Sequence, residues 1–207
     1  IWRSLVGSEM CIRDSYNITP GLKASLTVNT DFAETEVDDR QINLTRFPIR
    51  FPEKRDFFLE GANIFRFAPS SGVYPYFSRK IGLRSGNPIP ILYGGRVIGK
   101  IGKVEVAAQQ VKTRETDNFN SEDFSVIRLK QNFLKESSVG VLYTRRHTNK
   151  GKEFVPPLQD RNTLGVDLTL NTSTFLKNQN LQFQAFAVIH NPETPGEINN
   201  NIWDRSA

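Results

Sequence analysis

Residues 162–173 read Asn162-Thr-Leu-Gly-Val-Asp-Leu-Thr-Leu-Asn-Thr-Ser173, and this stretch decides the fold class. Its large apolar residues fall on every second position, at Leu164, Val166, Leu168 and Leu170. A period of two is that of a β-strand with one apolar and one polar face, whereas an amphipathic helix repeats its apolar residues every three to four positions. The stretch therefore predicts a β-strand.

The same alternation recurs on the N-terminal and C-terminal sides of this stretch. It predicts strands at residues 16–30, 91–101, 104–113, 123–134, 138–147 and 181–190. Short turns at 102–103, 135–137 and 176–180 alternate with long polar loops at 114–122, 148–161 and 191–201. We therefore expect an all-β protein whose strands form an antiparallel meander, with tight turns at one end of the sheet and long loops at the other.

Strand length and loop asymmetry favour a partial transmembrane β-barrel. Strands of about 9–11 residues cross a bilayer when tilted, and outer-membrane barrels have short turns on one side and longer loops on the other. The apolar faces would then meet lipid, with Tyr93 and Tyr143 in the aromatic girdles. The predicted lumen residues are Arg96, Lys100, Glu105, Arg128, Lys130 and Asp167. A soluble β-sandwich shares the alternation and stays open, although its strands average nearer 5–6 residues.

A second stretch, residues 43–65, mixes charges of both signs with aromatic residues. It is too charged for an ordinary core and too aromatic for a free linker, and buried charges need partners. We therefore predict a plug-like segment that packs inside the barrel, with a short helix at 52–60 and a short strand at 77–83. The predicted plug or lumen network consists of Arg46, Glu53, Lys54, Arg55, Phe57, Phe58, Glu60, Arg79, Arg96 and Lys100. Both structural packing and contact with a ligand stay open as its role.

Composition excludes several classes of protein for this 207-residue chain. Aromatic residues make up 11%, which disfavours simple disorder. The sequence contains no run of about 18 apolar residues, so no transmembrane helix is predicted. The net charge of +5 comes from Lys and Arg scattered among acids, which argues against a nucleic-acid partner. Cys11 is the single cysteine, so we expect neither a disulfide framework nor a thiolate metal site.

No catalytic or metal-binding motif emerges from the sequence. The acidic run between Asp31 and Asp39 lacks the spacing of an EF-hand loop. His147 and His190 have no histidine or cysteine at ligand spacing. We therefore predict no cofactor and no metal, and whether the protein is an enzyme stays open.

The N-terminal residues are set apart by their resemblance to non-biological sequence. Residues 4–15 resemble a translated sequencing adaptor, so we interpret residues 1–15 as an artefact and expect the authentic chain to begin near Tyr16 as an internal fragment. The rest of the chain divides into residues 16–87, the first strand plus the plug-like segment, and residues 88–207, the β-hairpins of a truncated barrel.

Several ordered phrases between residues 16 and 115 resemble one bacterial family. They lie at residues 26–38, 43–47, 51–61, 77–82 and 89–102, and one of them reads Phe51-Pro-Glu-Lys-Arg-Asp-Phe-Phe-Leu-Glu-Gly61. The family is an uncharacterised C-terminal domain, often preceded by a module similar to family 9 carbohydrate-binding modules. The resemblance implies a longer parent protein with a secretory signal, a periplasmic carbohydrate-binding-like module and a C-terminal barrel in the bacterial outer membrane.

The expected function follows from the fold and from this resemblance. It is solute transport or surface glycan handling, with outer-membrane lipid and a carbohydrate ligand as the expected partners. Two alternatives stay open: a secreted carbohydrate-active hydrolase, and a soluble glycan-binding β-sandwich in the periplasm or outside the cell.

Overall fold

The computed structural model describes residues 12–30, 51–84, 87–117, 119–149, 160–175 and 179–192. Arg46 and the acidic run that begins at Asp31 lie outside the described residues. The elements are β1 (Ile12–Thr19), β2 (Leu22–Thr30), α1 (Asp56–Leu59), the 3-10 helix η2 (Ser78–Lys80), β3 (Leu83–Arg84), β4 (Asn87–Pro88), β5 (Ile91–Ile101), β6 (Val104–Thr113), β7 (Glu122–Phe133), β8 (Ser137–Thr148), β9 (Arg161–Phe175) and β10 (Gln179–Pro192).

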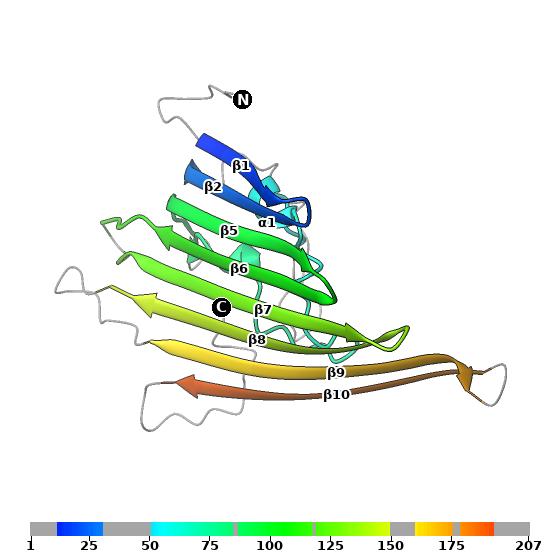
Figure 1. Ribbon diagram of the computed structural model, residues 1–207. Coiled ribbons are helices and arrows are strands. Elements are labelled where there is room, and N and C mark those ends of the chain that lie inside the picture. The colour runs from blue at the N-terminus through cyan, green and yellow to red at the C-terminus, as the bar shows by residue number, and fades with distance from the viewer. Residues whose placement is uncertain are drawn as a thin grey trace.

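Eight strands form one sheet in the order β1-β2-β5-β6-β7-β8-β9-β10 (Figure 1). Every neighbouring pair in it is antiparallel. Strands β3 and β4 form a separate two-stranded sheet. The predicted all-β antiparallel meander is confirmed. The eight-stranded sheet is not closed into a barrel, because β1 and β10 form its two edges.

The predicted strands from residue 91 onward and the predicted turns at 102–103 and 135–137 are confirmed with small shifts at their ends. The middle of the predicted turn at 176–180 lies outside the described residues. The turn between β5 and β6 lies at Gly102-Lys103, where Gly102 has a positive φ of 61°. Strand β9 and β10 are longer than predicted, and their hairpin extends beyond the end of β8 (Figure 1). No helix among the described residues has the length and apolar character needed to cross a membrane.

The prediction of one strand at residues 16–30 was wrong, because the chain forms the hairpin β1–β2 there. Its turn contains Pro20 and Gly21, a pair that favours turns. The Lys100 N–H donates to the Gly21 carbonyl at 2.7 Å, and a Cβ at Gly21 would lie 2.6 Å from the Lys100 carbonyl oxygen. Strand β1 begins at Ile12, so residues 12–15 belong to the sheet. The interpretation of residues 1–15 as an artefact stays a prediction.

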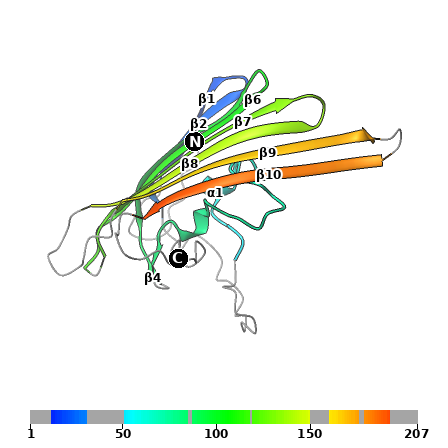
Figure 2. The same ribbon diagram turned by 90° about the horizontal axis from the view of Figure 1, so that it is seen from below.

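Residues 51–84, which we call the inner segment, lie against one face of the sheet (Figures 1 and 2). We call this the inward face and the opposite one the outward face. Two predictions within the segment were wrong. The helix begins at Asp56 rather than Pro52, because the Glu53 carboxylate accepts the N–H groups of Lys54 and Arg55 in an extended stretch. Residues 78–80 form a 3-10 turn in place of the predicted strand.

The core of the protein lies between the inner segment and the sheet. One cluster joins Phe65, Phe67 and Ala68 of the segment to Ile98, Ala107, Val126 and Leu142 of the strands. A second cluster joins Phe57, Phe58 and Ile81 to Ile91 and Val111. The segment therefore takes the place of the second layer that completes the core of an ordinary two-layer domain.

Candidate functional site: the inward face and the inner segment

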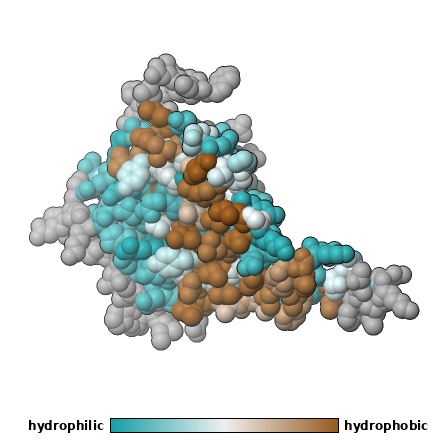
Figure 3. Space-filling model, in the orientation of Figure 1, coloured by the Kyte–Doolittle hydropathy of each residue, from teal (hydrophilic) through white to brown (hydrophobic). Residues whose placement is uncertain are grey.

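The inward face of the sheet is buried and carries charged side chains beside apolar ones, and the outward face is apolar and exposed. Arg128 is 1% exposed and Asp167 is 5% exposed, both on the inward face. Leu129 and Leu164, which point the other way, are 45% and 43% exposed. In a water-soluble sheet the apolar face is the one that is covered. The apolar side chains form a continuous band across the outward face, with hydrophilic surface on both sides of it (Figure 3).

A clasp of hydrogen bonds joins the two ends of the inner segment. The guanidinium of Arg55 donates to both Glu53 carboxylate oxygens at 2.9 Å. It also donates to the carbonyls of Ser78 and Ile81 at 2.8 Å, and the Ser78 hydroxyl donates to Glu53 at 2.7 Å. Arg79 donates to the Pro52 carbonyl at 2.7 Å. Arg55 lies 4.1 Å from the Phe58 ring centroid, so its buried charge is matched on all sides.

Glu60 joins the end of α1 to the sheet. Its carboxylate accepts hydrogen bonds from Arg96 at 2.7 Å, from Arg13 at 3.4 Å and from Lys23. Arg96 donates further to the carbonyls of Phe57 and, at 2.7 Å, of Glu60, and its guanidinium lies 4.9 Å from the Phe57 ring centroid. One acidic side chain of the segment therefore holds three cations on β1, β2 and β5.

A buried ion pair lies under the other half of the inner segment. Arg128 on β7 and Asp167 on β9 form a two-pronged pair across β8. The intervening residue on β8 is Gly140, where a Cβ would come within 2.7 Å of the Arg128 guanidinium. Arg128 lies 5.7 Å from the Phe67 ring centroid. The pair is thus enclosed by the strands on one side and an aromatic ring of the segment on the other.

Two glycines of the sheet leave room for aromatic rings of the segment. A Cβ at Gly165 would lie 2.7 Å from the Phe67 ring, and a Cβ at Gly94 would lie 3.2 Å from the Phe57 ring. Between these positions Gln109 donates to the Tyr76 hydroxyl at 2.9 Å. Burial raises the pKa of Tyr76, which keeps this phenol neutral. Small residues and one amide thus shape the inward face to fit the segment.

Glu53 and Glu60 of the inner segment are held ionised, and neither is suited to act as a proton donor. Burial raises the pKa of Glu53, but the hydrogen bonds and charge of Arg55 and the bond from Ser78 outweigh it and hold that pKa below its ordinary value. The hydrogen bond from Lys23 lowers the pKa of Glu60 against a smaller effect of burial. A glycosidase acid needs a raised pKa. Among the described residues no group of three or more His, Cys, Asp or Glu side chains could hold a metal ion.

Most of the predicted network residues come together in this site. Glu53, Arg55 and Arg79 form the clasp, while Phe57, Phe58, Glu60 and Arg96 form the contact of α1 with the sheet. Lys54 is half-buried beside the clasp. Lys100 differs from the others, because it lies exposed at the end of β5, about 13 Å along the strand from Arg96.

The sequence did not predict some members of the site. Lys23 and Arg13 join the Glu60 contact, and Gly94, Gly140 and Gly165 make room for side chains. Of these, Gly165 carried a signal, because it occupies a polar-face position in an otherwise regular strand, where glycine marks close approach. Of the predicted lumen residues, Glu105 and Lys130 form a half-buried pair on neighbouring strands, with 3.8 Å between their charged atoms.

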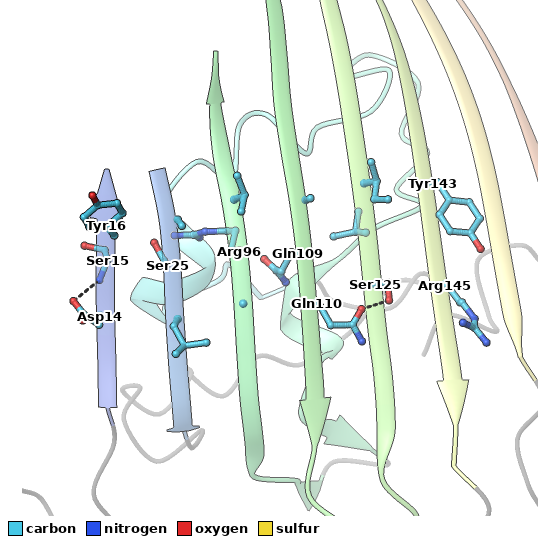
Figure 4. Close-up of a pocket in the computed structure, with 17 residues that line it drawn as sticks. Asp14, Ser15, Tyr16, Ser25, Arg96, Gln109, Gln110, Ser125, Tyr143 and Arg145 are labelled. Carbon is cyan, nitrogen blue, oxygen red and sulfur yellow. Dashed lines mark hydrogen bonds between the residues drawn. The ribbon is translucent and has the colours of Figure 1, made fainter. Parts of the chain in front are cut away.

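The outward face carries a shallow hollow of about 790 Å³ over β1, β2 and β5–β8. Ala24, Gly95, Val97 and Ala108 lie in it, and a Cβ at Gly95 would meet nothing within 4 Å. Gln110 and Ser125 hydrogen-bond to each other at this hollow, between the two ends marked by Tyr16 and Tyr143 (Figure 4). It is an open depression in an apolar face, so the enclosed inward side is the stronger candidate for a site.

The inner segment lies within a region of the chain that matches a known family model. Residues 15–91 match a family described as a domain of unknown function, DUF5916. The match includes most of the β1–β2 hairpin, the whole inner segment and the first residue of β5. It ends before most of the residues of the sheet that contact the segment. No curated protein and no solved structure matches the chain.

Proposed function

We propose that this chain forms part of the wall and the interior of a β-barrel in the bacterial outer membrane, and that the protein transports a solute or handles glycans at the surface. The observation that carries the proposal is the reversed polarity of the two sheet faces. A face rich in Leu, Val, Ile and Phe stays uncovered while a face with Arg and Asp is buried. Lipid as the solvent of the outward face accounts for this reversal.

The position of the apolar band on the strands supports the same proposal. Residues that pair across neighbouring strands lie on a line perpendicular to the strands. One such line joins Leu26 on β2, Gly95, Gln110, Ser125, Arg145, Asn162 and Asn191 on β10. The line starts inside the apolar band at Leu26 and lies outside it at Asn191. On β10 the outward apolar residues run from Leu181 to Ile189, so their centre is near Ala185.

The angle between the apolar band and the perpendicular to the strands gives the tilt that the strands would have in a membrane. On β10 this line lies at Asn191 and the centre of the band lies at Ala185, so the two are six residues, or about 20 Å, apart along the strand. The six strand spacings from β2 to β10 add up to about 29 Å across the sheet. The band therefore crosses the strands at roughly 35° from the perpendicular. Strands of a membrane barrel tilt by about 35–45° from the membrane normal, which gives a level lipid band this slope.

The free edges of the sheet agree with a barrel of more strands. Strands β1 and β10 have no neighbour on their outer sides among the described residues. An exposed edge of 14 residues such as β10 invites pairing. We propose that additional strands close the barrel.

The alternatives have less support from the structure. A soluble β-sandwich needs a second sheet over the apolar face, and among the described residues only the two-stranded β3–β4 forms another sheet. A carbohydrate hydrolase needs one protonated and one ionised carboxyl. In the inner segment Glu53 and Glu60 are both held ionised by basic side chains. Glycan contact therefore enters the proposal as binding or passage rather than hydrolysis.

The proposal is tested by heat-modifiable gel migration of the complete parent protein from fractionated bacteria. We expect the protein in the outer-membrane fraction and a band that shifts on boiling, because closed barrels resist unfolding in detergent. A protein that stays in the soluble fraction and shows no shift contradicts the membrane proposal. Carbohydrate-dependent changes in ion conductance, measured next in planar bilayers, test the proposed role in solute or glycan handling.

A further inference from the structure

We infer that the inner segment is a fixed constriction that folds inward from the long-loop end of the barrel and stays docked while the protein works. This inference rests on the proposed membrane barrel and adds the direction from which the segment enters and its immobility.

The topology shows from which end the segment enters. Strand β2 runs from the short Pro20-Gly21 turn to Thr30, and β5 begins at Ile91 and runs back to the short turn at Gly102. The segment is inserted between Thr30 and Ile91, so both of its connections are at the end of the sheet with the long loops. In outer-membrane barrels that end faces the cell exterior. The segment is thus one long loop folded inward.

The clasp makes the segment a closed loop. Arg55 and Arg79 bond the stretch 52–55 to the stretch 78–81. The residues between them cannot extend as a free strand unless the bonds from Arg55 to the Ser78 and Ile81 carbonyls and from Arg79 to the Pro52 carbonyl are broken. Both guanidinium groups are buried, and leaving the donors of a buried charge without acceptors is strongly unfavourable.

The contacts with the sheet involve all eight of its strands. At one edge Arg13, Lys23 and Arg96 hold Glu60. In the middle Ala107, Val126 and Leu142 pack on the segment. At the other edge Gly165 accommodates Phe67, Phe186 meets the same ring at 6.1 Å, and the Gln184 side chain accepts the Ser70 N–H at 3.3 Å.

The inward face also carries apolar residues that suit a permanent partner. Ile98, Ala107, Val111, Val126 and Leu142 point inward, although the interior of a water-filled barrel is polar. Withdrawal of the segment would expose these five side chains together with its own phenylalanines. Exposing apolar surface to water on both the segment and the sheet would be unfavourable. If the segment moved in and out, we would expect polar side chains on the part of the sheet that it contacts.

A reversible disulfide tests whether the segment moves. The Cβ position at Gly61 lies 3.6 Å from the Ile98 Cβ, within the range of a disulfide. We would introduce Gly61→Cys with Ile98→Cys in a Cys11→Ser background of the complete protein. The oxidised and reduced forms share the strain of a side chain at Gly61, whose φ is +69°, so each is the control for the other. We expect equal conductance in planar bilayers for the two forms. Conductance that appears only after reduction overturns the inference.

Cysteine labelling supplies a second readout that does not require a conducting barrel. Both residues belong to the segment: Ala68 is 0% exposed where the segment packs against the sheet, and Leu59 is exposed. With single cysteines at these positions, we expect a membrane-impermeant maleimide to label Ala68→Cys about 100-fold or more slowly than Leu59→Cys, because labelling must wait for local opening. Comparable rates overturn the inference.

The two proposals can fail separately. A heat-modifiable barrel whose Ala68→Cys reacts quickly keeps the membrane role and loses the fixed constriction. A soluble protein whose Ala68→Cys stays protected loses the membrane role, and the segment is then an ordinary part of the core.

Discussion

The outward and inward faces of the sheet differ in which residues their surroundings accept. Asp167 and Leu168 are neighbours in β9 and point to opposite faces. Asp167 is enclosed with Arg128 beneath Phe67, while the row that contains Leu168 remains uncovered. The inner segment covers the face with the charges because it supplies carbonyls, carboxylates and aromatic rings to match them. The comparison teaches that burial here follows specific pairing, whereas the apolar row of the outward face is left uncovered.

Asp167→Asn should have the largest effect, because it removes the partner of a charge that is 1% exposed. We expect a loss of about 3–5 kcal/mol in the free energy of unfolding, as for a broken buried pair. Urea unfolding of the protein refolded into lipid vesicles measures it. The double variant Arg128→Leu with Asp167→Leu is the control and should recover most of the loss. A single variant as stable as the parent would show that the pair is solvated.

Leu168→Arg tests the outward face in the same strand. If this position meets lipid near the membrane midplane, the substitution should cost about 2–4 kcal/mol in vesicles. The matched control is Thr169→Arg, which points inward, beside Ser138 and Gln184, and should cost much less. Both variants are compared by urea unfolding in the same vesicles. Equal tolerance at the two positions would contradict the assigned facing.

Gly165→Leu and Gly95→Leu compare the two faces through added volume. The side chain at Gly165 collides with the buried Phe67 ring, so we expect a loss of about 1–3 kcal/mol from overpacking. Gly95 opens onto the outward hollow, and leucine there should change the unfolding free energy by less than about 0.5 kcal/mol. Loss of protection of Ala68→Cys in the Gly165 variant alone would locate the damage in the inner segment.

Glu60→Gln should have a smaller effect than Asp167→Asn, Leu168→Arg or Gly165→Leu. Its partners Arg13 and Lys23 are more than a third exposed, so solvent and salt screen the contacts. We expect a loss of at most about 1 kcal/mol, which should shrink further in high salt. Asp56→Asn, at the more exposed acid at the start of α1, is the control and should be neutral. A loss that does not depend on salt would mean that Arg96 alone carries the contact.

Acid should weaken the inner segment before the sheet. The pKa values of Glu53 and Glu60 lie below their ordinary value of 4.5, so their contribution to stability is complete above that pH. It is lost as the pH falls through the lowered values. The Ala68→Cys protein is incubated at each pH and then returned to neutral pH in the presence of maleimide. Labelling should accelerate only after incubation below about pH 4. Acceleration between pH 5 and 7 would point to other groups.

The sequence predicted the repeating parts of the molecule better than the single contacts. Alternation fixed strands β5–β10 and the facing of residues such as Arg128 and Val166, because a period of two depends only on local geometry. The density of opposite charges near Arg55 predicted an enclosed segment. The clasp partner Ser78 and the space at Gly165 could not be predicted, because they arise where residues distant in sequence meet. The hairpin β1–β2 was missed because alternation continues through a two-residue turn.

The contact between Phe67 and strand β9 has a consequence for the order in which the protein folds. The ring lies against Gly165, and the neighbouring Ser70 N–H bonds to Gln184, which is 114 residues away in the chain. Contacts of such separation close late, because the intervening chain must first be ordered. The segment leaves the ribosome before β9 and β10. Docking of its tip therefore waits for the pairing of β9 with β10, and protection at Ala68 would report when this step is complete.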